Sequence, residues 1–367
     1  MLCLSGPRLE RARASKQFQD GRFRNTAKVA PGLKGNPLPI MGEFFFGGRS
    51  RVPPAPLPVQ SPLEAWTRAI GSGLRITWLG HSTLLLEIDG VRILTDPVFG
   101  ERASPLSFAG AKRFHPVPAS IAQLPPLDAV LLSHDHYDHL CEQSARELAK
   151  LRVPVITSLG VGLRLEQFGW DPERVIELDW WEEHTLDGGR LAITATPSQH
   201  FSGRTLTDRN ATLWSSWVIR TDNRKLFFSG DTGLTDEFAA VRERFGGFDV
   251  TMLEIGAWHP AWGDIHLGPE NALRAFELLG GGALLPIHWS TFDLGLHPWA
   301  EPAETLFNLA AAKHVRVLTP LLGRPFEPDH VEAPTPWWRA VTAARRDSAL
   351  ATAVDPLEPQ PSRGSPR

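Results

Sequence analysis

The chain has 367 residues, of which 42% are hydrophobic and 22% charged, so it can bury a sizeable core. The formal net charge is −3, so the chain has no overall excess of basic residues, which argues against nucleic acid as a partner. No apolar run reaches the roughly 18 residues that span a bilayer, and the one at the N-terminus is too short for a secretory signal.

Composition divides the chain into three regions. Residues 1–70 are rich in Pro, Gly and Arg, and we expect a partly extended segment that packs on the main domain. Residues 71–330 carry dense strand and helix signals and form the predicted main domain. Residues 331–367 form a C-terminal segment, whose Pro-, Ser- and Arg-rich end is predicted to be disordered.

Apolar runs predict the elements of the main domain in order. Residues 74–79, 83–88 and 91–94 should form an antiparallel meander, because Asp89-Gly90 is a hairpin turn signal. Further strands are predicted at 128–132, 153–157, 175–178, 250–255, 283–287 and 315–318. A second antiparallel set is predicted at 191–196, 213–219 and 225–228. Helices are predicted at 144–151 and 269–279, where apolar residues recur with helical spacing.

The segment HDHYDH at residues 134–139 directly follows the predicted strand 128–132. So many ionisable side chains cannot all be core residues, because burying them without partners would cost several kcal/mol. The H-x-H alternation places His134 and His136 on one side of an extended segment, where both can bind one metal ion. Asp138 and His139 then turn towards a second ion as the chain enters its helix.

Three later residues each follow a predicted strand: His200, Asp231 and His288. Strand ends hold side chains on a rigid scaffold and leave them accessible. Zinc prefers imidazole nitrogen and carboxylate oxygen, and its catalytic sites keep a position open for water. The residues together therefore predict a two-metal site, with two zinc ions per chain, although manganese or iron suits such donors nearly as well.

The order of these residues resembles the metallo-β-lactamase superfamily, whose H-x-H-x-D-H loop, later histidine, bridging aspartate and last histidine match one by one. The resemblance implies an α+β fold, the four-layer αββα sandwich, with 71–330 as the hydrolase domain. It implies a first ion held by His134, His136 and His200. It further implies that Asp138, His139 and His288 hold the second ion, while Asp231 bridges the two.

Shorter segments narrow the resemblance to one branch. GHST at 80–83, LTDPVF at 94–99, IHWSTF at 287–292 and GRFRN at 21–25 are similar to the branch that contains N-acyl-phosphatidylethanolamine-hydrolysing phospholipase D. This resemblance covers about residues 20–330. It implies a phosphodiesterase of lipids, in which a hydroxide that bridges the metals attacks phosphorus and releases phosphatidate and an N-acylethanolamine.

Supporting roles follow from position in the chain. The candidate catalytic residues are Asp231, His81 and His266. Asp231 is also a predicted ligand, and it could orient the nucleophile and relay its proton. His81 could instead be satisfied by backbone groups, and His266 could lie at the surface or cap a helix. Asp96 could accept a hydrogen bond from a ligating histidine or serve only in a turn. Tryptophans near these segments could wall an apolar substrate groove or simply pack in the core.

Other functions remain open at this point. A lactonase or phosphoesterase that acts on a sugar phosphate would need a groove lined by Arg or Lys, whereas a lipid substrate would need an apolar one. A metal-binding module without turnover is the non-enzymatic alternative. The partner is thus a lipid or another small molecule.

The expected location is the cytoplasm, because only two cysteines, Cys3 and Cys141, occur. A peripheral membrane contact could come from the island at residues 44–46, which is Phe-Phe-Phe, beside Arg49 and Arg51. The alternative is that these phenylalanines pack the N-terminal segment onto the domain.

Overall fold

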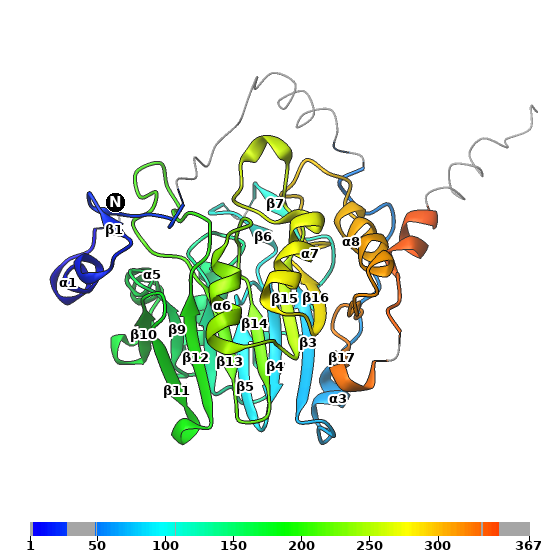
Figure 1. The fold of residues 1–367 in the computed structure, drawn as a ribbon, viewed down its shortest axis with the longest axis horizontal. Coiled ribbons are helices and arrows are strands. Elements are labelled where there is room, and N and C mark those ends of the chain that lie inside the picture. Colours follow the sequence, from blue (N-terminus) through cyan, green and yellow to red (C-terminus); the bar gives the residue numbers. More distant parts are fainter. Residues whose placement is uncertain (1–2, 28–47, 49, 107, 332, 345–367) are drawn as a thin grey trace, which may run out of the picture.

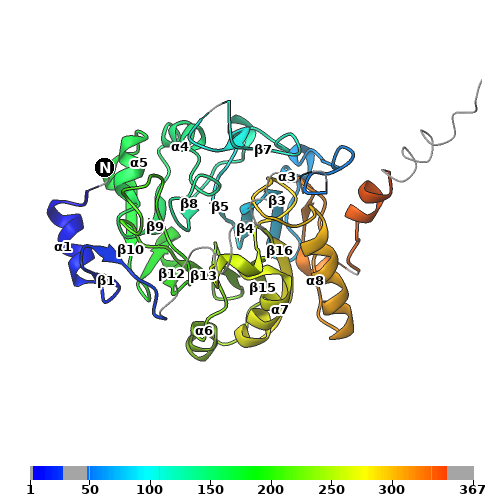
Figure 2. The same ribbon diagram turned by 90° about the horizontal axis from the view of Figure 1, so that it is seen from above.

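The computed structural model describes residues 3–27, 48, 50–106, 108–331 and 333–344. Two mixed β-sheets lie face to face, and helices cover their outer faces (Figures 1 and 2). This arrangement confirms the predicted αββα sandwich of the α+β class. Within the described residues, no helix is long and apolar enough to cross a membrane.

The first sheet has seven strands in the order β10-β9-β8-β5-β4-β3-β17. Their bounds are β3 Leu74–Gly80, β4 Thr83–Ile88, β5 Val91–Thr95, β8 Ala129–Leu132, β9 Val155–Ser158, β10 Val175–Leu178 and β17 Pro325–Phe326. Strands β3, β4 and β5 pair antiparallel as the predicted meander, whereas β5, β8, β9 and β10 pair parallel.

The second sheet has six strands in the order β11 to β16. Their bounds are β11 Glu183–Leu186, β12 Leu191–Thr196, β13 Ser216–Arg220, β14 Lys225–Phe228, β15 Val250–Glu254 and β16 Ala283–Ile287. Strands β11 to β14 pair antiparallel, and β14, β15 and β16 pair parallel. The predicted strand at 315–318 is wrong, because only Val317 forms an isolated bridge, to Leu284.

Helices α4 (Glu142–Ala149) and α5 (Gly162–Gln167) cover the first sheet, α6 (Glu237–Phe245) and α7 (Gly268–Leu279) cover the second, and α8 (Glu301–Ala312) packs beside α7 (Figure 2). The sequence predicted α4 and α7 but not the other three. Shorter elements complete the described chain: α1 (Gly6–Ala14), β1 (Phe18–Gln19), β2 (Arg22–Phe23), α3 (Leu63–Trp66), β6 (Arg102–Ala103), β7 (Ala111–Lys112), η1 (Ile121–Gln123), η2 (Pro172–Arg174), η3 (Asp187–Gly189), η4 (Pro260–Trp262) and η5 (Pro328–His330).

The alternation of side chains along each strand builds two apolar layers. Ile76, Leu84 and Ile93 of the first sheet belong to the main core, together with residues of the second sheet such as Phe227. The neighbouring positions, such as Leu85, point the other way and pack with α4 and α5. Because both faces are covered, the strands read as nearly continuous apolar runs.

Residues 3–27 pack against the domain. Leu4 and Phe23 lie in a small apolar cluster with Trp180 and Trp214. The division of the chain at residues 70 and 330 stays a prediction. The phenylalanine island at 44–46, Arg49 and the tail from 345 lie outside the described residues.

Candidate metal centre

The strands that lead into the predicted site residues end at one edge of the sandwich, the upper edge in Figure 1. All of these residues except His266 lie just beyond a strand: His81 after β3, residues 134–139 after β8, His200 after β12, Asp231 after β14 and His288 after β16. Because these strands end at the same edge, residues separated by more than 200 positions lie within interaction distance. The side chains form two neighbouring groups of four, which share the same rim.

The first group consists of His134, His136, His200 and Asp231. His134 Nε2 lies 2.9 Å from His136 Nδ1, and His136 Nδ1 lies 3.2 Å from His200 Nε2. Three imidazole nitrogens thus converge on one point, as expected for ligands of a single ion. Asp135 lies between the first two histidines in sequence, but its side chain interacts elsewhere, with Arg164 at 3.3 Å.

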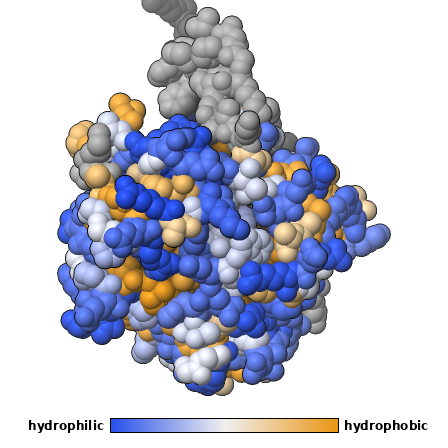
Figure 3. All heavy atoms as spheres, turned by 60° about the vertical axis from the view of Figure 1, so that its left-hand side comes forward, coloured by the Kyte–Doolittle hydropathy of each residue, from blue (hydrophilic) through white to orange (hydrophobic). Residues whose placement is uncertain are grey.

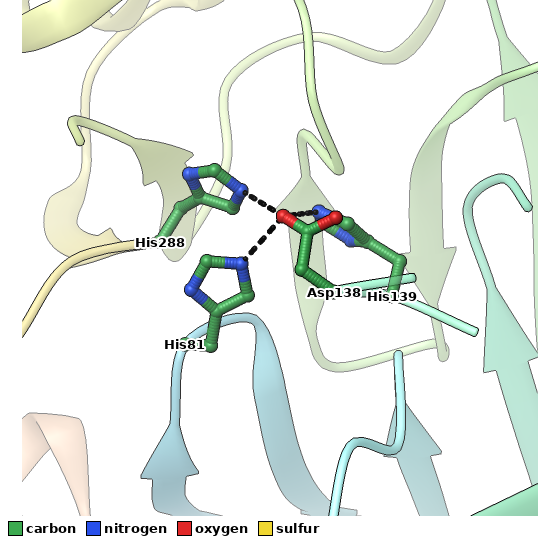
Figure 4. Close-up of side chains that lie close together, drawn as sticks. All are labelled: His81, Asp138, His139 and His288. Carbon is green, nitrogen blue, oxygen red and sulfur yellow. Dashed lines mark hydrogen bonds and ion pairs between the residues drawn. The ribbon is translucent and has the colours of Figure 1, made fainter. Parts of the chain in front are cut away.

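The second group consists of His81, Asp138, His139 and His288 (Figure 4). Oδ2 of Asp138 is at its centre, 3.2 Å from His288 Nε2, 3.0 Å from His81 Nε2 and 3.6 Å from His139 Nε2. The sequence predicted three of these as ligands, whereas it predicted His81 only as a supporting residue.

The carboxylate of Asp231 lies between the two groups. Its Oδ1 is 3.0 Å from His139 Nε2 and 3.1 Å from His288 Nε2, both in the second group. Its Oδ2 faces the first group, 3.9 Å from His134 Nε2 and 3.7 Å from His200 Nε2. One oxygen therefore points to each group, which is the arrangement that a bridging ligand requires.

Surrounding groups fix the orientation of the histidine rings. His139 Nδ1 lies 2.6 Å from Asp96 Oδ2, so Asp96 supports a candidate ligand as the sequence suggested. Nδ1 of His200 lies 2.8 Å from the carbonyl oxygen of Ile265. In each case Nδ1 donates its proton outward and Nε2 is left as the nitrogen that faces the site.

Burial and charge pairing have opposite effects on the pKa values of the histidines and carboxylates in this centre. Burial, followed by the neighbouring histidines, holds the pKa of His134 well below its ordinary value. Burial also disfavours charge on His288, but the carboxylates of Asp231 and Asp138 outweigh it and raise the pKa to about 10. The pKa of Asp231 is held well below its ordinary range, because His139 and His288 outweigh the effect of burial.

Two buried atoms indicate that the residues fit metal ions. Nε2 of His139 and Oδ1 of Asp231 lie 3.0 Å apart without the geometry of a hydrogen bond, and neither has another hydrogen-bond partner within the described part of the chain, although buried polar atoms normally have one. Both atoms lie where the two groups of ligands meet. A nitrogen-rich donor set with carboxylate oxygens suits zinc, iron or manganese. The residues present could therefore hold two such ions.

His266 belongs to a third, overlapping group with Asp231, Glu254 and His288. Nδ1 of His266 lies 2.6 Å from Glu254 Oε2, and the ring lines a pocket of about 120 Å³ beside the centre. The structure therefore places His266 beside the predicted ligands rather than at a surface distant from them.

Sequence reasoning missed Glu254. This carboxylate is fully buried at the end of β15 and accepts hydrogen bonds from the backbone N–H of Thr232 at 2.6 Å and of Leu267 at 3.3 Å. It thereby connects the segment that follows Asp231 with the segment that carries His266. A glutamate within the apolar run 250–255 was the signal that could have identified it.

The tryptophans near the site divide into two pairs. Trp289 and Trp299 are buried in the main core, as ordinary packing predicts. Trp258 and Trp262 line the pocket beside His266 instead. The other lining residues are His259, Gly263, Asp264, Leu267, Pro269, Glu270 and Asn271.

Solved structures share this fold. A metallo hydrolase of the archaeon Ignicoccus hospitalis matches with a TM-score of 0.53 at 24% identity, over 69% of this chain and 98% of its own. An isothiocyanate hydrolase of Delia radicum gut bacteria matches with a TM-score of 0.55 at 22% identity, over the same share of each chain. At these identities the match concerns the fold alone.

Relatives by sequence are more similar. An uncharacterized protein of Mycobacterium tuberculosis is 45% identical over 291 residues, which cover 78% of this chain and 77% of that protein. An N-acyl-phosphatidylethanolamine-hydrolyzing phospholipase D of Caenorhabditis elegans is 38% identical over 66% of this chain and 71% of its own length. The mitochondrial enzyme of that name in Saccharomyces cerevisiae is 36% identical over 64% of this chain and 51% of its own length.

A family model described as the Beta-lactamase superfamily domain matches residues 91–289, which include β5 to β16 and all but one of the residues in the two groups of four. More distant relatives in Pyrobaculum are named metal-dependent hydrolases. With the two ligand groups at the rim of the sandwich, these matches show that the chain belongs to the β-lactamase superfamily and is a metal-dependent hydrolase.

Proposed function

We propose that this hydrolase is a phosphodiesterase of the phospholipase D type, which uses two zinc ions to cleave lipids like N-acyl-phosphatidylethanolamine into phosphatidate and an N-acylethanolamine. One observation carries the proposal: Asp231 joins two complete groups of metal ligands in a chain that is 38% identical to an enzyme named for this reaction. The donor atoms would serve manganese or iron nearly as well, and elemental analysis of the purified protein distinguishes the three metals.

Bound ions would polarise the phosphoryl oxygen and provide hydroxide at neutral pH. Asp231, with one oxygen towards each group, would fix the spacing of the two ions and orient the nucleophile. Asp96 would hold His139 with Nε2 facing inward. His266, which Glu254 holds through Nδ1, would form a hydrogen bond with the substrate through its other nitrogen.

The pocket beside His266 favours this substrate class over a sugar phosphate. Among its described lining residues are Trp258, Trp262, Asp264 and Glu270, but no lysine or arginine. A second phosphate group in this pocket would lie near the carboxylates of Asp264 and Glu270, whose like charge disfavours its binding. An uncharged polar group, such as the amide of an N-acylethanolamine, meets no such penalty.

Contact with a lipid surface is part of the proposal. The face in Figure 3 has apolar patches among hydrophilic side chains. Among the described residues, Phe108 is 78% exposed and Leu206 is fully exposed, and both are on loops. Such side chains can enter the interface of a bilayer. A cytoplasmic protein with peripheral membrane contact fits these features, with the segment at 44–46 as a further candidate.

The test is hydrolysis of N-acyl-phosphatidylethanolamine in mixed micelles by the full chain loaded with zinc, with products identified by mass spectrometry. We expect phosphatidate and N-acylethanolamine, and no turnover by the Asp231→Asn variant. Phosphatidylethanolamine without the N-acyl group and a sugar-phosphate lactone serve as competing substrates. Turnover of the lactone alone would support the alternative hydrolase. If the protein binds ions but cleaves neither these lipids nor bis-p-nitrophenyl phosphate, the phosphodiesterase proposal is refuted.

A further inference from the structure

We infer that His81 is itself a ligand of the second metal ion, in addition to Asp138, His139, His288 and the bridging Asp231. This inference rests on the proposed two-metal centre but not on the identity of the substrate. The motifs of the superfamily place no ligand at this position, so the inference comes from geometry alone. Figure 4 shows the four side chains of the group around Oδ2 of Asp138.

The distances from Asp138 to His81 and His288 match those between ligands of one ion. Ligand atoms about 2.0–2.1 Å from an ion lie about 2.9–3.4 Å apart when they subtend 90–109° at it. His81 Nε2 and His288 Nε2 lie 3.0 and 3.2 Å from the same oxygen of Asp138. With His139 Nε2 at 3.6 Å, three imidazole nitrogens surround one carboxylate oxygen. His81 is thus placed in the same way as two residues that the family pattern already assigns to the ion.

The ring of His81 has no other polar role within the described chain. The side chain is 2% exposed, and its Nδ1 is buried without a hydrogen-bond partner. Its Nε2 interacts with Asp138 alone. Burial of a polar ring is unfavourable unless it finds a partner. A metal ion at the centre of the group would form a strong bond with Nε2, and that bond would compensate for the burial of the ring.

The backbone holds His81 in an unusual conformation. Its φ is 52°, in the left-handed region that residues other than glycine rarely adopt. The N–H of His81 donates to Thr291 Oγ1 at 2.7 Å, while its carbonyl oxygen accepts from Trp78 Nε1 at 2.8 Å and from the N–H of His288 at 3.1 Å. Hydrogen bonds therefore hold this turn against the segment that carries His288. Strain of this kind is typical of functional sites.

The consequence is a metal centre with two unequal sites. The first group offers four protein atoms, including Oδ2 of Asp231, whereas the second offers five when His81 and Oδ1 of Asp231 are included. Catalytic zinc sites commonly use three protein ligands and a water. We therefore expect a five- or six-coordinate ion in the second site and a more open ion in the first.

Titration of metal-free full-length protein with Co²⁺ tests the inference without any substrate. Wild type should bind two ions, and the visible spectrum of the second should have the weak bands of high coordination. In His81→Ala we expect the Kd of the second ion to rise by more than about 100-fold, beyond the 10–100-fold typical of residues that only support a ligand. The first Kd should stay unchanged, and the bands of the second ion should intensify as its coordination number falls.

Two further variants separate ligation from a structural role. His81→Gln keeps a donor that can reach Asp138, so if His81 only supports Asp138 this variant should bind the second ion like wild type. Such a result would overturn the inference. Thr291→Val is the matched control, because it removes the bond to the N–H of His81 and keeps the ring. It should lower the melting temperature and retain both ions.

A measurement on wild type guards against variants that fail to fold. In the proton NMR spectrum of the Co²⁺-loaded protein, each ligating histidine contributes one shifted, exchangeable ring N–H signal. Six signals are expected with His81 as a ligand, and five would contradict it. Failure to cleave N-acyl-phosphatidylethanolamine would leave the six signals unaffected, so the substrate proposal and this inference can fail separately.

Discussion

Replacing Asp96 by Asn tests how far the surrounding groups control the metal ligands. The carboxylate of Asp96 accepts three hydrogen bonds: its Oδ1 accepts from Ser133 N–H at 2.7 Å, and its Oδ2 accepts from Ser133 Oγ at 2.7 Å and from His139 Nδ1 at 2.6 Å. Asn can keep the first bond through its carbonyl oxygen. The hydroxyl of Ser133 can rotate to accept from the new amide. The Nδ1–H of His139 cannot change from donor to acceptor in this way, and it would face the amide N–H of the new Asn, which is also a donor.

Two costs follow from that mismatch. If His139 keeps its tautomer, a charge-assisted hydrogen bond of about 1.5–3 kcal/mol is lost in a fully buried place. If it moves the proton to Nε2, the nitrogen that faces the ions can no longer bind one. Either way we expect the Kd of the second ion to rise by about 10–100-fold, which equals about 1.4–2.7 kcal/mol.

The assay is titration of metal-free Asp96→Asn with Zn²⁺ or Co²⁺, together with its melting curve. Thr83→Val is the control, because the hydroxyl of Thr83 bonds to the backbone carbonyl of Asp96 at 2.7 Å and leaves the carboxylate untouched. The control should lose stability without losing metal affinity. If Asp96→Asn binds both ions as tightly as wild type, the carboxylate does not set the orientation of His139 and the reasoning is wrong.

Four other outcomes are expected. Asp231→Ala should lower the metal content from two ions per chain towards none, and one tightly held ion would contradict the bridge. His136→Ala and His288→Ala should each reduce hydrolysis by orders of magnitude and lose different ions, so an active His288→Ala would indicate single-metal chemistry. Because the pKa of His288 is raised to about 10 in the metal-free protein, it is protonated at neutral pH; metal affinity should therefore fall towards acid pH, and calorimetry in buffers of different ionisation enthalpy should detect proton release. Arg75→Met removes the partner 2.5 Å from the buried Glu87 and leaves it with Arg92 at 3.0 Å, which should cost about 1–3 kcal/mol in urea unfolding, and a loss below about 0.5 kcal/mol would refute this.

Local sequence was sufficient for much of the fold. The bounds of β4, β10, β12, β14 and β16 agree with the predicted runs residue for residue, because these short runs are rich in apolar and β-branched residues. Polar or amphipathic elements were harder to predict. The strand β11 (Glu183–Leu186) alternates exposed and half-buried residues, and its pairing with β12 is what makes it a strand.

For the site, the sequence by itself determined which residues carry the chemistry but not how they meet. The spacing of residues 134–139 and the strand ends before His200, Asp231 and His288 identified seven candidate ligands, because few other roles accept such residues together. Only the tertiary structure decided that His81 lies 3.0 Å from Asp138, and that Glu254 holds His266 at 2.6 Å. The first contact joins the segments that follow β3 and β8, and the second joins the end of β15 to the segment before α7. No local pattern encodes these distances, because they are set only when the strands and loops are packed together.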